Sequence, residues 1–111
     1  MAVKVLIKRS VPEDMAKDLF PLFTEMRVRA TDQPGYISGE TLRRLDKPGE
    51  SLVISTWRSI EAWKRWKDSP ERHEVQGKID SLLGAVTEFE VYDYGFADER
   101  DDQDFLITKT Q

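Results

Sequence analysis

The sequence contains no cysteine and only one histidine, His73. The lack of cysteine excludes disulfide bonds, thiolate chemistry and cysteine-ligated zinc or iron–sulfur sites. No stretch reaches the roughly 18 consecutive apolar residues of a membrane span, and the first ten residues have too few apolar residues in a row for a signal peptide. We therefore expect a cytoplasmic protein that has no membrane partner.

Clusters of positive charge are also missing. The net charge is -4, and most of it lies after Gly95, where five acidic residues face two basic ones. Because no group of lysines and arginines is interleaved with aromatic residues, we expect no nucleic-acid partner. We expect residues 1–95 to form one domain, followed by an acidic tail (residues 96–111) that is either disordered or docked on a partner subunit.

The pattern of apolar residues predicts one small α+β domain. Alternation predicts a strand over residues 3–9, and further strands follow at residues 36–44, 52–57 and 86–94. An apolar stripe at helical spacing runs from Met15 to Ala30, with Pro21 predicting a kink or a late helix start. The other predicted helices begin after Ser59 and Ser69, which are suitable N-caps, and the last ends at Gly84.

The resulting order, β-α-β-β-α(α)-β, is that of a ferredoxin-like fold with a four-stranded antiparallel sheet. If the helices cover one face of the sheet, the other face carries Leu6, Tyr92, Tyr94 and either Leu52 or Val53. Solvent exposure of these side chains would be unfavourable. We therefore expect a homodimer in which two sheets pack together as a dimeric α/β barrel.

Residues 34–79 carry a family resemblance. They include Pro-Gly-Tyr after the first helix, a strand ending in Thr-Trp, a helix with Trp63 and Trp66, and Ser-Pro-Glu at the next helix start. This pattern resembles the antibiotic biosynthesis monooxygenase family of dimeric α/β barrels, and the likeness extends from about residue 3 to residue 94. The same scaffold hosts cofactor-independent oxygenases, heme-degrading enzymes and proteins of no known activity.

The cofactor-independent branch implies a monooxygenase that oxidises a small aromatic or quinol-type substrate with dioxygen in an apolar pocket. Such a site needs aromatic side chains to stack on the substrate and polar groups to orient its oxygens. The candidates for these roles are Trp66, Trp63, Arg72 and Gln76 on the predicted helices, together with Lys8 and Ser55 if their strand faces line the pocket. Each also has a purely structural interpretation: Trp63 as a core residue, Arg72 as a surface or dimer-interface charge, and Lys8 as a solvated strand residue.

The heme-degrading branch is the first alternative. Similar enzymes use an asparagine on the first strand, a tryptophan in the second helix and a histidine ligand on the following helix. Trp66 matches the tryptophan, but Lys8 and Gln76 stand at the other two positions. His73, one helical turn from Gln76, is the only residue left as a heme-ligand candidate.

The second alternative is a dimeric protein that binds small molecules, or acts under stress, without turnover. The sequence shows no paired carboxylates, no glycine-rich phosphate loop and no nucleophile beside a base. No catalytic residue and no metal site can therefore be assigned, and an enzyme and a binding protein both remain compatible with the sequence.

Overall fold

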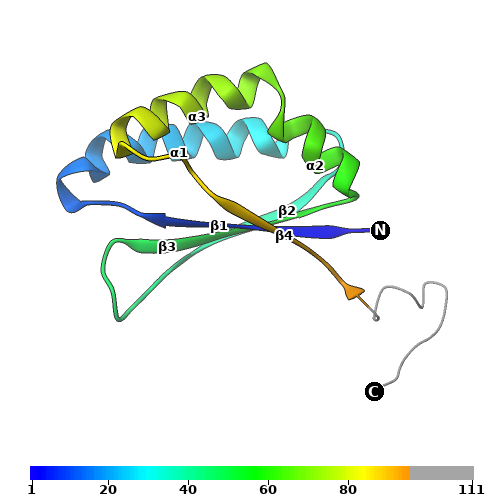
Figure 1. Cartoon of the computed structure of the whole chain (residues 1–111), viewed down its shortest axis with the longest axis horizontal. Coiled ribbons are helices and arrows are strands. Elements are labelled where there is room, and N and C mark those ends of the chain that lie inside the picture. Colours follow the sequence, from blue (N-terminus) through cyan, green and yellow to red (C-terminus); the bar gives the residue numbers. More distant parts are fainter. Residues whose placement is uncertain (96–111) are drawn as a thin grey trace.

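The computed structural model describes residues 1–95; the expected tail, residues 96–111, lies outside the described residues. Four antiparallel strands form one sheet in the order β2-β3-β1-β4. The helices lie on one face of this sheet (Figure 1), which confirms the expected ferredoxin-like α+β fold. The elements are β1 (Val3–Ser10), the 3-10 turn η1 (Glu13–Met15), α1 (Ala16–Thr31), β2 (Tyr36–Arg43), β3 (Glu50–Trp57), α2 (Ile60–Lys67), α3 (Pro70–Leu83) and β4 (Phe89–Asp93).

The two faces of the sheet follow from the alternation of β1. Val5 pairs with Ser55 of β3 and Val91 of β4, and this inner face also carries Val3, Ile7 and Arg9. Leu6 pairs with Ile54, and the outer face continues with Lys4 and Lys8, as alternation requires. The side chain of each β1 residue therefore belongs either to the helix-covered face or to the opposite one.

The predicted helix ends are confirmed. The Ser59 hydroxyl accepts a hydrogen bond of 3.1 Å from the backbone N–H of Ala62, and the Ser69 hydroxyl accepts one of 3.2 Å from that of Arg72. Pro70 follows at the first position of α3, where its missing N–H costs no helical bond. Gly84 ends α3 in the left-handed conformation, with φ 70°.

Three local features refine the predictions. A 3-10 turn precedes α1, which begins at Ala16, so Pro21 lies inside the helix rather than at a late start. The bulge in β2 lies at Ile37, while Gly39 allows the close approach of the Tyr36 hydroxyl, with which a Cβ would collide. The strand β4 has only five residues, so it is shorter than the strand predicted over residues 86–94.

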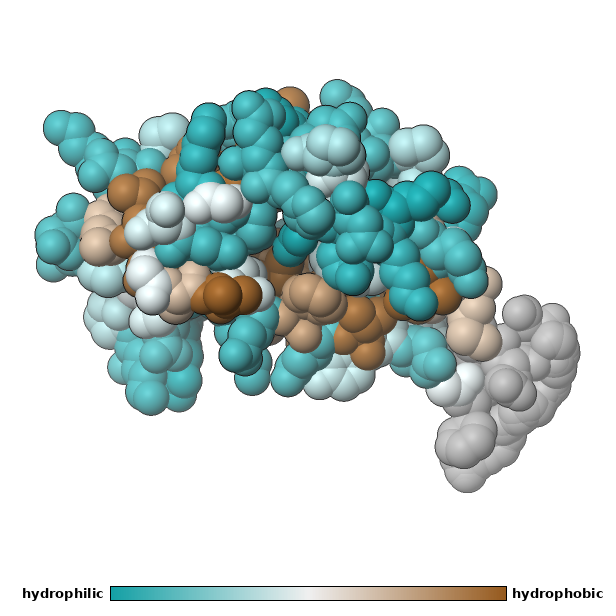
Figure 2. Space-filling model, turned by 45° about the horizontal axis from the view of Figure 1, so that its top comes forward, coloured by the Kyte–Doolittle hydropathy of each residue, from teal (hydrophilic) through white to brown (hydrophobic). Residues whose placement is uncertain are grey.

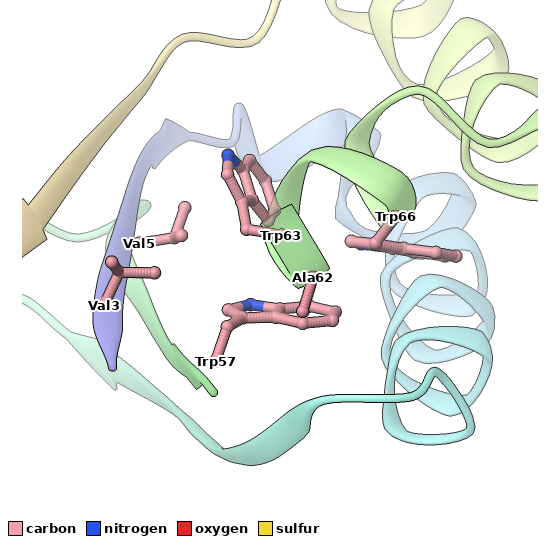
Figure 3. Close-up of a cluster of buried hydrophobic side chains, with 6 residues drawn as sticks. All are labelled: Val3, Val5, Trp57, Ala62, Trp63 and Trp66. Carbon is pink, nitrogen blue, oxygen red and sulfur yellow. The ribbon is translucent and has the colours of Figure 1, made fainter. Parts of the chain in front are cut away.

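Two groups of buried side chains form the core, one between the sheet and α2 and one between helices. The first joins β1 and the end of β3 to α2, and Figure 3 shows its members: Val3, Val5, Trp57, Ala62, Trp63 and Trp66. The second joins α1 to α3 through Leu19, Val75 and Ile79. The apolar stripes predicted for α1 and α3 therefore face each other.

The outer face of the sheet carries no helix (Figure 1). Leu6, Leu52 and Ile54 are half-buried there, and Tyr92 and Tyr94 at its β4 side are exposed. Among residues 1–95, no helix is long and apolar enough to cross a membrane.

Candidate functional site

A cavity of about 910 Å³ lies between the inner face of the sheet and the helices. Its apolar walls come from three elements of the fold: the sheet, α1 and α2. It reaches from the tryptophans to the β2–β3 hairpin, and the exposed ring of Phe20 lies at its rim. Apolar side chains also gather on the surface along the boundary between the helices and the sheet (Figure 2).

All three tryptophans line this cavity. The Trp57 and Trp63 rings meet edge to face with centroids 5.8 Å apart, and Tyr36 meets Trp57 in the same way at 5.3 Å. The Trp57 indole N–H donates to the Ser55 hydroxyl at 3.0 Å. The tryptophan rings are buried, and Trp66 is only 3% exposed. They therefore belong to the core and also form one aromatic wall of the cavity.

Arg72 and Gln76 are the polar residues that α3 brings to the cavity. Both are buried, at 7% and 8% exposed, so Arg72 is neither a surface charge nor free in solvent. Its guanidinium donates to the Lys67 carbonyl at 3.3 Å and to the Gln76 side-chain oxygen at 3.4 Å. Burial lowers the pKa of Arg72, partly offset by the charges of Asp80 and Asp68.

Gln76 is held by partners beyond the cavity wall. Its side-chain amide donates to Asp80 Oδ1 at 2.9 Å and to the Thr87 hydroxyl at 2.7 Å. Asp80 Oδ1 also accepts from the backbone N–H and the hydroxyl of Thr87. This network fixes the orientation of Gln76, so its oxygen faces Arg72.

Arg9 is a cavity residue that the sequence analysis did not select. It comes from the inner face of β1 and lies beside the ring of Phe23. Its pKa is lowered to about 10, first by burial and then by the charge of Arg72, against the attraction of Asp80. Its Nε is buried and has no hydrogen-bond partner in the described part of the protein. Arg9 could have been selected from the sequence, because the alternation of β1 places its side chain on the same face as Val5.

The structure brings five of the six predicted binding residues to one cavity: Trp63, Trp66, Arg72, Gln76 and Ser55. Lys8 instead lies on the outer face of β1, is exposed, and borders a separate cavity of about 350 Å³ beside β4. Lys8 and Arg9 are adjacent in β1, so their side chains point to opposite faces of the sheet, and only that of Arg9 faces the large cavity.

His73 is exposed on α3 and does not line the large cavity. A heme in this cavity would therefore not meet His73, and the residue one turn along, Gln76, already donates both bonds described above. Within residues 1–95, no group of three histidine and acidic side chains is placed to hold a metal ion. The described residues do not fit heme ligation.

The family assignment rests on a match to a family sequence profile. The sequence profile described as antibiotic biosynthesis monooxygenase matches residues 2–78, which cover β1 through most of α3. The chain belongs to the antibiotic biosynthesis monooxygenase family. The resemblance noted in the sequence is thereby confirmed.

Relatives of this antibiotic biosynthesis monooxygenase family member are distant. A 42.8 kDa protein in the whiE locus of Streptomyces coelicolor is 23% identical over 99 residues, which are 89% of this chain. The chain spans about a quarter of that relative's length, since 24% of it is covered.

Solved structures show the same fold. SnoaB, a cofactor-independent oxygenase from Streptomyces nogalater, superposes with a TM-score of 0.72 at 18% identity, covering 83% of this chain and 91% of SnoaB. A conserved protein from Methanosarcina mazei Go1 gives a TM-score of 0.75 at 17% identity, with 83% and 91% covered. Rv0793 from Mycobacterium tuberculosis gives 0.73 at 20% identity, with 84% and 94% covered.

Proposed function

We propose that the protein is a cofactor-independent monooxygenase that oxidises a small aromatic or quinol-type substrate with dioxygen. The observation that carries this proposal is the large cavity, in which an aromatic wall faces the buried guanidinium of Arg72, to which Gln76 is hydrogen-bonded. Its volume, about 910 Å³, is enough for a substrate of several fused rings, since pockets for drug-sized ligands span roughly 300–1,000 Å³.

The residues of the cavity support the chemistry that such a substrate needs. The rings of Trp63 and Trp66 form a flat apolar surface for an aromatic substrate, and they exclude water from it. A buried guanidinium at Arg72 favours the ionised form of a phenol or enol placed beside it. Ionisation raises the electron density of the ring, which then passes an electron to dioxygen.

The overall reaction balances without a cofactor. For an anthrone-type substrate, a ring methylene becomes a carbonyl, one oxygen atom of dioxygen enters the product, and the other leaves as water with the two hydrogens of the methylene. The substrate supplies all the electrons. The role of the protein is to bind the substrate, to stabilise its anion and to keep bulk water away.

Oxygen uptake tests this proposal. We expect an oxygen electrode to record uptake above buffer autoxidation for at least one member of a panel of hydroquinones and anthrones. The Gln76→Met variant should lower the rate, because it removes the side-chain oxygen that accepts a hydrogen bond from Arg72 and so helps to position its guanidinium, whereas Gln33→Met, outside the cavity, should not. Saturable binding of the same compounds with no uptake would instead establish a binding protein without turnover.

Hemin titration separates the heme alternative. A saturating Soret shift that His73→Ala abolishes would place heme chemistry ahead of the cofactor-independent reaction. We expect no such shift, because His73 is exposed and lies outside the cavity lining.

A homodimer is part of the proposal. The outer face of the sheet presents Leu6, Leu52 and Ile54 without a covering helix, and a second copy that packs against the same face would bury them. Sedimentation should give a dimer at micromolar concentration. Ile54→Lys should shift it toward monomer, whereas Val28→Lys, on the exposed side of α1, should not. A monomeric wild-type protein would contradict this packing.

A further inference from the structure

Two arginines from different elements line one cavity. Arg9 comes from β1 and Arg72 from α3, and both reach the large cavity. The pKa of Arg9 is lowered, first by burial and second by the positive charge of Arg72. Two like charges in a partly desolvated place are unfavourable unless an anion lies between or beside them.

The carboxylates near this pair compensate it incompletely. Asp80 attracts both arginines, but its Oδ1 accepts its hydrogen bonds from Gln76 and Thr87. Asp68, which also attracts Arg72, pairs with Lys67 at 3.2 Å. Within residues 1–95, no salt bridge to Arg9 or Arg72 is formed.

Hydrogen-bond donors are also left over. A guanidinium has five N–H donors. Arg72 makes two bonds, at 3.3 and 3.4 Å, which are longer than the usual range of roughly 2.7–3.2 Å. The buried Nε of Arg9 makes none. Both guanidinium groups therefore keep unused donors, and a compact acceptor with two oxygens binds a guanidinium in a bidentate manner.

The remaining charged side chains of the cavity lie at its rim. Glu13, Arg27, Glu40 and Arg43 are exposed, and Arg44 pairs with Asp46 at 2.7 Å and with Glu50 at 3.3 Å. Solvent screens such charges. The uncompensated positive charge of the interior is therefore that of Arg9 and Arg72.

Aromatic rings adjoin both guanidinium groups. The Arg9 guanidinium carbon is 4.4 Å from the centre of the Phe23 ring, and that of Arg72 is 5.7 Å from the centre of the Trp63 ring.

We propose that the cavity binds an aromatic carboxylate, whose carboxylate is held by Arg9 and Arg72 and whose rings lie against Trp63 and Trp66. This inference rests on the proposed function, because it assigns the substrate class of the same cavity.

Calorimetric titration of the full chain with 2-naphthoate and with its neutral analogue 2-naphthamide tests the inference. The wild-type protein should bind naphthoate at least about tenfold more tightly, as expected for a charge-assisted bidentate contact. Arg9→Met should remove most of this preference by weakening naphthoate and leaving naphthamide unchanged. The matched control is Arg58→Met, because Arg58 is exposed and outside the cavity lining.

The outcomes separate this inference from the proposed function. Equal affinities for the two ligands in the wild-type protein would overturn the carboxylate site and leave an aromatic-binding cavity. Binding of neither ligand would count against the cavity as a substrate site altogether. The wild-type comparison needs no variant, so it decides the matter even if Arg9→Met does not fold, and Arg72→Met then provides the second test of the pair.

Discussion

The guanidinium of Arg9 stacks on the ring of Phe23 at 4.4 Å, while its Nε faces no acceptor. The contact supplies packing and a cation–π attraction, but the charge is partly buried and is repelled by the charge of Arg72. We expect this arrangement to cost folding free energy, and the binding role proposed for Arg9 would account for that cost.

Arg9→Met should stabilise the protein. Methionine keeps an unbranched apolar side chain over Phe23 and removes a buried charge that no salt bridge compensates. We expect the free energy of unfolding to rise by about 1–3 kcal/mol, measured by urea denaturation. Arg58→Met, at an exposed position, should change it by no more than about 0.5 kcal/mol. A loss of stability in Arg9→Met would show that the guanidinium is better compensated than its contacts indicate.

The advantage of Arg9→Met should depend on pH. The pKa of Arg9 is lowered to about 10 in the folded protein, below its value in the unfolded chain. Between the two pKa values the unfolded chain binds more protons, so the stability of the wild-type protein rises with pH. The destabilisation by the charge is fully present below about pH 9 and decreases as the pH passes 10. Urea denaturation of both proteins between pH 8 and pH 11 should show the gap narrowing only at the alkaline end. A constant gap would contradict the assignment to Arg9.

Two glycines should respond in opposite ways to alanine. Gly35 has φ +90°, and a Cβ there would lie 2.5 Å from the Cβ of Ala62, so Gly35→Ala should cost about 2–4 kcal/mol of stability. Gly77 lies inside α3 with no atom within 4 Å of an added Cβ. Gly77→Ala should therefore stabilise by about 0.5–1 kcal/mol. Thermal denaturation compares the two, and similar effects would contradict the close approach of Gly35 to α2.

Thr87 should matter more than its half-buried position suggests. Its hydroxyl bonds to both Gln76 and Asp80, so Thr87→Val leaves these side chains short of a partner. We expect a loss of about 1–3 kcal/mol, together with weaker ligand binding because Gln76 is no longer fixed. Thr41→Val, at an exposed β-strand position, is the control for the removal of a hydroxyl in the stability measurement alone, because Thr41 also borders the cavity. Equal stabilities of the two variants would show that the network is not formed.

Local signals allowed most of the fold to be predicted from sequence. Ser59, Ser69 and Gly84 act through bonds and dihedral angles within a few residues of themselves, so their roles can be recognised without the tertiary structure. The length of β4 could not be predicted in this way. Its pairing depends on β1 rather than on its own alternation.

The site was predictable only in part, for the same reason. Trp63 and Trp66 stood out by residue type, but whether a tryptophan lines a cavity depends on how closely the helices approach the sheet. Arg72 was placed beside the buried stripe of α3 by helical angle, yet its burial requires the contact between α3 and the rest of the fold. Arg9 was overlooked in favour of Lys8, because residue type alone does not separate two neighbouring basic residues.

The strict alternation of β1 sets a limit on how this protein can evolve. Exchanging a side chain within β1 alters one contact, on one face of the sheet. Adding or removing a single residue before Arg9 would instead turn that side chain away from the cavity and bring its basic neighbour Lys8 or an outer-face residue inward. Substitutions along β1 can therefore change the cavity one side chain at a time. An insertion or deletion in β1 would instead exchange the residues that face the cavity with those on the outer surface.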